Sequence, residues 1–292
     1  YARDGSLVPR SVPGAVIHEP AEVADRVARM AREGRVRAVD GAILIISAIS
    51  GVKAETEKIY KFACDYEIPR IAFVSKLDKE RADYFRAVGD MEKYFCKNAI
   101  VLQLPIGLED KFSGVVDLIR MKALLFAQDG SGRIEEKDVP ADMKEQAAAY
   151  RKKLVEQVAE TDDALLEKYL DKGDLPDGDV IAGLKHGTLG GGLLPVLCGS
   201  PVKNMGIQPL LDMVLTCLPS PAEHARVVQI KGKDPKTGNE VVRKAEDEQL
   251  AAIVFKTIID PFAGKLSLIR VLSGTIKADS SIYNATKQAK EK

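Results

Sequence analysis

Short apolar runs alternate with amphipathic stretches over much of the chain. Residues 41–48 form an apolar run rich in β-branched side chains, and similar runs follow at 70–74 and 193–198. Such runs are typical of strands that are buried on both faces of a parallel sheet. Residues 54–66 have apolar side chains at helical spacing. A strand, a helix and a strand without a hairpin turn form a βαβ unit, so we predict an α/β fold with a parallel sheet.

The same periodicities predict the remaining elements. Three more helices are expected, at 79–95, about 141–170 and 207–217. Six more β-like runs lie at 100–104, 114–118, 123–126, 251–256, 266–272 and 281–283. Pro219 and Pro221 stop the helix at 207–217 and open a candidate interdomain linker. Because every run after this linker is β-like, we predict a second domain that consists of strands.

Charge and hydropathy limit the classes of protein that remain. The 292 residues contain 43 Lys plus Arg and 43 Asp plus Glu, so the formal net charge is zero. This balance argues against a surface that is basic all over, although a local basic face is compatible with it. No apolar run approaches eighteen residues, so we expect no membrane-spanning helix and no membrane partner.

Cysteine and histidine usage bears on the compartment and on metals. The four cysteines form no Cys-x-x-Cys pair and lie in or beside apolar stretches: Cys64, Cys96, Cys198 and Cys217. Buried free thiols in a reducing cytoplasm are therefore expected. The three histidines include no pair at ligand spacing, so no zinc site is predicted.

The N-terminal segment differs in composition from the rest of the chain. Residues 1–40 hold seven of the sixteen arginines and none of the twenty-seven lysines, and the first lysine is Lys53. The pattern at 22–37 predicts an Arg-rich helix. We therefore treat 1–39 as a compositionally foreign segment.

Two short motifs follow predicted strands and carry the candidate chemistry. Ser-Lys-Leu-Asp at 75–78 follows the second strand, and Gly-Ser-Pro at 199–201 follows the run at 193–198. A carboxylate can accept two hydrogen bonds from N1 and N2 of guanine, which adenine does not supply, while a lysine stem covers the face of the base. Loops at the carboxyl ends of parallel strands converge on one ligand. The candidate guanine-binding residues are Ser75, Lys76, Asp78, Ser200 and Pro201.

Four collinear segments resemble elongation factor G. Residues 40–82 resemble the second half of its GTPase domain, and 104–122 the subdomain inserted into that domain. Residues 198–221 are similar to its fifth GTPase motif, and 253–284 to the start of its β-barrel domain. Tetracycline ribosome-protection proteins and release-factor-type GTPases share this architecture. The resemblance implies a translation factor that binds GTP or GDP with Mg²⁺, contacts ribosomal RNA and ribosomal proteins, and is cytoplasmic.

The resemblance also refines the expected fold and its boundaries. It implies a P-loop-GTPase-type parallel sheet that lacks its P-loop end, with an inserted α+β subdomain, followed by the beginning of a translation-factor β-barrel. We expect a partial GTP-binding domain at 40–221, with the inserted subdomain at about 97–192. The linker and the start of the barrel are expected at 222–292.

Several family motifs are absent or altered in the 292 residues. There is no Gly-x-x-x-x-Gly-Lys-Ser/Thr phosphate loop and no switch-one threonine region. His-Glu-Pro-Ala-Glu at 18–22 stands where the family has Asp-Thr-Pro-Gly-His, so no catalytic residue is predicted. Ser75 replaces the family's Asn, and Pro201 replaces its Ala. Proline has no N–H for the guanine O6, and an unpaired acceptor costs about 1–3 kcal/mol.

These departures leave three interpretations open. The chain is an elongation-factor-G-like factor impaired in GTP binding and hydrolysis, in which Lys76 and Asp78 remain of the family type. Alternatively, it is a nucleotide-independent ribosome-binding paralogue or a ribosome-protection-type protein. The third interpretation is an inactive, truncated product.

Overall fold

The structure, a computed structural model, describes most of the chain after residue 38. The described residues are 39–95, 98–220, 223, 230–233, 239–260, 262, 264–285 and 287–291. They belong to two compact units, one that ends at Leu218 and one that starts at Pro219. The helix expected at 22–37 lies outside the described residues.

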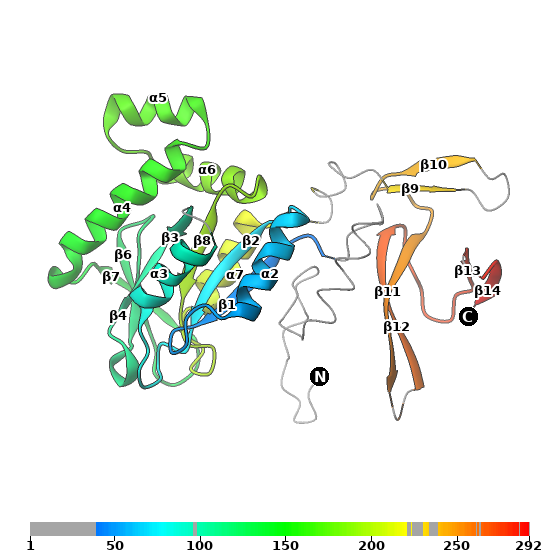
Figure 1. Ribbon diagram of the computed structural model, residues 1–292, viewed down its shortest axis with the longest axis horizontal. Coiled ribbons are helices and arrows are strands. Elements are labelled where there is room, and N and C mark those ends of the chain that lie inside the picture. Colours follow the sequence, from blue (N-terminus) through cyan, green and yellow to red (C-terminus); the bar gives the residue numbers. More distant parts are fainter. Residues whose placement is uncertain are drawn as a thin grey trace. The chain divides into compact units, whose positions relative to one another are not determined.

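A four-stranded parallel sheet organises the first unit (Figure 1). Its strands, in spatial order, are β1 (Ala42–Ser47), β2 (Arg70–Ser75), β8 (Leu194–Cys198) and β3 (Ala99–Val101). Every residue of β2 and β8 is buried, as their continuous apolar runs predict. The helix α2 (Ala54–Asp65) connects β1 to β2, so the predicted βαβ unit and parallel sheet are confirmed.

Two further helices of this unit follow the predictions to different degrees. The helix α7 (Ile207–Cys217) has the predicted limits. The helix α3 (Tyr84–Tyr94) begins later than the predicted residue 79, because Asp83 is its N-cap. The Asp83 carboxylate accepts a hydrogen bond of 2.9 Å from the Arg86 N–H, which satisfies a donor in the first helical turn.

An antiparallel sheet lies between β3 and β8 in the sequence. Its strands are consecutive in space: β4 (Gln103–Ile106), β5 (Gly114–Asp117), β6 (Lys122–Phe126) and β7 (Ile134–Asp138). The single strand predicted at 100–104 is wrong, because the chain passes from one sheet to the other at Leu102. The strand β7 was missed by the sequence pattern, since all five of its residues are exposed.

Three helices follow β7 in the sequence: α4 (Lys144–Ala159), α5 (Asp163–Lys172) and α6 (Asp177–Leu189). The prediction of one helix at about 141–170 is therefore wrong. Asp162 separates α4 from α5 because its carboxylate accepts hydrogen bonds from the N–H groups of Ala164 and Leu165. Three glycines within α6 obscure its helical pattern in the sequence. These strands and helices lie within the residues where the inserted α+β subdomain is expected, and α6 also packs against β2, β8 and α7.

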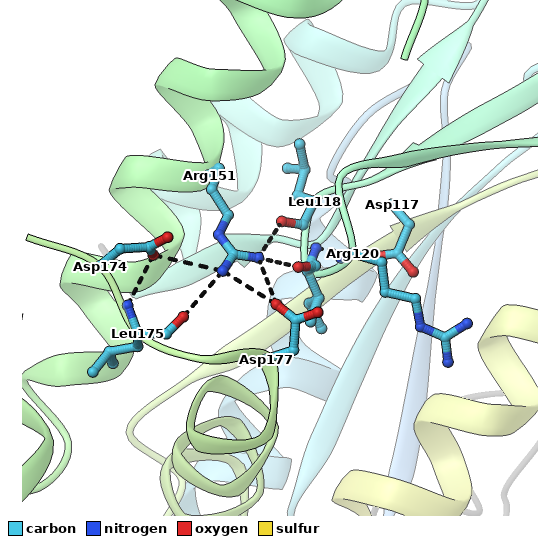
Figure 2. A network of polar contacts seen from close by, with 8 residues as sticks. Asp117, Leu118, Arg120, Arg151, Asp174, Leu175 and Asp177 are labelled. Carbon is cyan, nitrogen blue, oxygen red and sulfur yellow. Dashed lines mark hydrogen bonds and ion pairs between the residues drawn. The ribbon is translucent and has the colours of Figure 1, made fainter. Parts of the chain in front are cut away.

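Arg151 joins three segments of this subdomain (Figure 2). Its side chain is 13% exposed and donates hydrogen bonds of 3.1 Å to the carbonyls of Leu118 and Leu175. It also donates to the Ile119 carbonyl and to the Asp177 carboxylate. One guanidinium on α4 thereby connects the turn after β5 with the segment that leads into α6.

The second unit has strands as its described elements of more than one residue, and Glu223 is its one helical residue among those described. Three antiparallel pairs are formed by β9 (Ile230–Lys233) with β10 (Glu240–Arg243), β11 (Ala251–Asp260) with β12 (Gly264–Ser273), and β13 (Ile282–Asn284) with β14 (Ala289–Glu291). The predicted change to β structure is confirmed, and these strands are consistent with the start of a β-barrel. Among the described residues, no helix has the length and apolarity needed to span a membrane.

The described cysteines are free thiols: Cys64 is half-buried, and Cys198 and Cys217 are buried. Cys96 lies outside the described residues. Burial raises the pKa of the Cys198 thiol far above its usual value, and it raises the pKa of Cys217 to about 11. Both thiols are therefore neutral in the folded protein at physiological pH.

We expect the folded state to lose stability as the pH rises above about 9. In the unfolded chain Cys198 ionises near its usual pKa of 9.0, whereas in the folded protein it stays protonated. Well below pH 9 the thiol is protonated in both states and does not change the free energy of unfolding. By pH 10 its ionisation in the unfolded chain lowers the free energy of unfolding by about 1.4 kcal/mol. Urea unfolding at pH 7 and pH 10 measures the loss. Cys198→Ala should show a smaller loss, and an equal loss in this variant would contradict the assignment.

Candidate functional site

Two loops meet at the carboxyl ends of β2 and β8. We call residues 75–81 the β2 loop and residues 199–205 the β8 loop. The Gly199 N–H donates to the Val74 carbonyl at 3.0 Å, and the Leu77 N–H reaches the Gly199 carbonyl at 3.5 Å. The structure thus places the two predicted motifs side by side, as expected from the parallel pairing of β2 with β8.

Asp78 provides a carboxylate at this meeting point. Its side chain is 2% exposed, and Lys79 Nζ lies 3.2 Å from Oδ2. Burial tends to raise the pKa of Asp78, but the neighbouring Ser200 hydroxyl and Lys79 ammonium outweigh it, so the pKa lies below its usual value of 3.8. The carboxylate is therefore ionised at neutral pH and available only as a hydrogen-bond acceptor.

Ser200 contributes a buried hydroxyl beside this carboxylate. The residue is fully buried, and its Oγ has no partner of standard hydrogen-bond geometry among the described residues. It is nevertheless close enough to Asp78 to lower the pKa of that carboxyl.

The backbone of the β8 loop is closed on itself. Ser200 and Met205 exchange two backbone hydrogen bonds, of 2.9 and 3.0 Å, and the Asn204 N–H donates to the Pro201 carbonyl at 3.1 Å. Ser200 therefore uses its N–H within the loop, and Pro201 has none. Neither of these two residues offers a backbone N–H to a guanine O6.

Ser75 and Lys76 occupy different environments. Ser75 is 5% exposed, and its hydroxyl donates a 3.2 Å hydrogen bond to the Ile46 carbonyl of β1. Lys76 is exposed and has a φ of 66°, an uncommon left-handed conformation for a residue other than glycine. The structure thus directs the Ser75 hydroxyl into the sheet and leaves Lys76 at the surface.

Glu109, which lies in the inserted subdomain, was missed by the sequence analysis. Its N–H donates to the Leu77 carbonyl, and its Oε1 accepts from the Arg81 N–H, both at 2.7 Å. No local pattern could identify these contacts, because Glu109 is 28 residues from Arg81 in the sequence.

The described residues show no prearranged cation site. No three metal-ligating side chains cluster in the part of the chain that the structure covers. We assign no step to a metal in this chain.

The parallel sheet, the paired loops and the inserted subdomain define a GTPase-type α/β domain. The family model described as the elongation factor Tu GTP binding domain matches residues 25–220, which is more than half of the chain. The chain belongs to this family of translational GTPases. The expected relationship to elongation-factor-G-like proteins is confirmed at this level, and the match begins inside the segment 1–39 that composition set apart.

A solved structure supports the same fold. A crystal structure of a protein from Thermus thermophilus is similar to this chain with a TM-score of 0.70 and 27% sequence identity. The similarity covers 89% of this chain and 35% of the Thermus chain. The present chain therefore spans about a third of the length of that protein.

Proposed function

We propose that this chain is an elongation-factor-G-like translation factor that keeps the guanine-recognition part of the GTP site. The observation that carries the proposal is the ionised Asp78 carboxylate where the β2 and β8 loops meet, on a side chain that is 2% exposed. Such a carboxylate in a GTPase-type sheet suits the paired N1–H and N2–H donors of guanine. The ribosome as partner and a cytoplasmic location belong to the proposal through family membership.

The guanine base and the phosphates are expected to contribute unequally to the binding free energy. Asp78 accepts hydrogen bonds from the base, and the Lys76 stem covers its face. Pro201 leaves the guanine O6 without a backbone donor, which costs about 1–3 kcal/mol. The 292 residues contain no phosphate-loop motif, so the backbone donors and lysine that hold the β- and γ-phosphates are missing. We therefore propose weak guanine binding and no GTP hydrolysis above background.

Guanosine should bind this chain more tightly than adenosine, and Asp78→Asn should abolish the preference. The asparagine amide would place donors against guanine's own donors, so we expect at least a tenfold loss of guanosine affinity, about 1.4 kcal/mol. Saturation-transfer NMR with both nucleosides measures the preference. Asp110→Asn, at an exposed residue of the inserted subdomain, is the control. An unchanged preference in Asp78→Asn would contradict the proposed site.

A nucleotide-independent role in ribosome binding is the second candidate. Two observations favour it: the Ser75 hydroxyl is bonded to Ile46 within the sheet, and Ser200 and Pro201 offer no backbone N–H. Co-sedimentation with ribosomes in the absence of nucleotide would support this role. A chain that fails to pellet at low salt would argue against it.

A further inference from the structure

Two loops of the inserted subdomain reach the candidate site. Residues 107–113 connect β4 to β5, and residues 127–133 connect β6 to β7. The first contacts the β2 loop, and the second contacts the β8 loop. The strands that carry these two connections belong to a different sheet from β2 and β8. The β2 loop and the β8 loop are thus each contacted by a connection of the same antiparallel sheet.

Glu109 fixes the β2 loop on both sides of Asp78. Its N–H donates to Leu77, the residue before Asp78, and its carboxylate accepts from the N–H of Arg81, three residues after Asp78. Glu109 has a φ of 60°, and a left-handed conformation at a residue other than glycine costs on the order of 1–3 kcal/mol. The surrounding contacts therefore maintain a strained backbone at the residue that contacts the site.

The β8 loop has a corresponding contact. Asn204 Nδ2 donates to the Gly130 carbonyl at 3.2 Å, and Asn204 also has a positive φ, of 53°. A Cβ at Gly132 would lie 2.1 Å from Nε2 of Gln208 and 2.6 Å from Nδ2 of Asn204. The Gln208 and Asn204 side chains would have to move to admit this Cβ, and Gly132 also has a φ of 72°, which disfavours any other residue at this position.

We propose that the inserted subdomain sets the geometry of the guanine site and that Glu109 is a positioning residue for Asp78. This inference rests on the guanine site proposed above. With Leu77 and Arg81 both bonded to Glu109, the direction of the intervening Asp78 carboxylate is restricted. Because coupling between sites is reciprocal, a ligand that moves Glu109 changes guanine affinity by the same factor by which guanine changes the affinity of that ligand.

Amide hydrogen exchange of the 292-residue chain tests the positioning without nucleotide. Glu109→Ala should exchange at least about tenfold faster than the wild-type protein in the peptide 77–82, because the Arg81 N–H loses its acceptor. Glu109→Gln keeps an oxygen acceptor and should restore the wild-type rate. Asp110→Ala, at the adjacent exposed residue, should leave the rate unchanged. Gly132→Ala should accelerate exchange in 199–206 and tests the second contact independently.

Saturation-transfer NMR on the same variants separates this inference from the proposed function. Faster exchange in Glu109→Ala, together with loss of the preference for guanosine over adenosine and rescue of both by Glu109→Gln, supports the inference. Unchanged exchange in Glu109→Ala overturns it, whatever the nucleoside data show. If the wild-type protein lacks a guanosine preference while exchange in Glu109→Ala is faster, the proposed guanine function fails and the positioning of the loop by Glu109 stands.

Discussion

Arg151→Ala is expected to lower the free energy of unfolding of the first unit by about 3 kcal/mol. The substitution removes the donor that joins the Leu118 and Leu175 carbonyls to α4, and it leaves Asp177 without this guanidinium (Figure 2). Water can reach the half-exposed carboxylate but is largely excluded from the arginine position, which is 13% exposed. The buried carbonyls therefore account for most of the loss.

Urea unfolding followed by circular dichroism at 222 nm measures this effect, since the helices α2 to α7 all belong to the first unit. Lys152→Ala is the matched control on the same helix. Its side chain is 71% exposed and pairs with Glu156 at 3.9 Å, so a change within about 0.5 kcal/mol is expected. Arg151→Lys should restore little stability, because an ammonium cannot reproduce the planar fork. Equal stability of Arg151→Ala and Lys152→Ala would contradict this account.

Gly206→Ala is expected to destabilise the protein by about 3 kcal/mol or more. Gly206 has a φ of 78°, and a Cβ on it would lie 2.4 Å from the Cys198 carbonyl oxygen, which is a backbone atom. Neither the left-handed backbone nor the contact can be relieved by rotating a side chain. Because Gly206 directly follows the β8 loop and precedes α7, the change should also disturb Ser200.

Gly89→Ala makes the same substitution but is expected to stabilise the protein. Gly89 lies inside α3, and nothing would lie within 4 Å of its added Cβ. Alanine is the better helix former, so this variant should gain about 0.5–1 kcal/mol. The two variants are compared by urea unfolding under identical conditions. A similar change in the free energy of unfolding for both variants would contradict the claim that close backbone packing at Gly206 causes the destabilisation by Gly206→Ala.

The sequence allowed prediction of the elements with strong local patterns. The apolar runs of β2 and β8 identified two strands that are buried throughout. The run at 41–48 also marks a strand, but the prediction that β1 is buried on both faces is wrong, because Ile45 is 44% exposed. The pattern of α7 gave both of its ends. The parallel pairing then implied that the β2 and β8 loops would meet, and they do.

Features that depend on distant contacts could not be predicted in this way. Leu102 lies between β3 and β4. Its N–H donates a hydrogen bond to the Val196 carbonyl of the parallel sheet, and its carbonyl accepts one from the Leu118 N–H, which follows β5 of the antiparallel sheet. The use of the Ser200 N–H within its own loop and the contacts of Glu109 likewise depend on the folded backbone. The sequence thus indicated which residue types form the candidate site. Only the structure shows which of their hydrogen-bonding groups are already used within the protein.

The central claim is that the 292-residue chain retains guanine recognition without a competent phosphate site. A fluorescence titration of this chain with mant-GDP in the presence of Mg²⁺ tests it most directly. A dissociation constant of 1 μM corresponds to about 8 kcal/mol of binding free energy, which base contacts alone should not provide. We predict no saturable binding in the micromolar range. Binding with a micromolar or tighter dissociation constant would contradict the account.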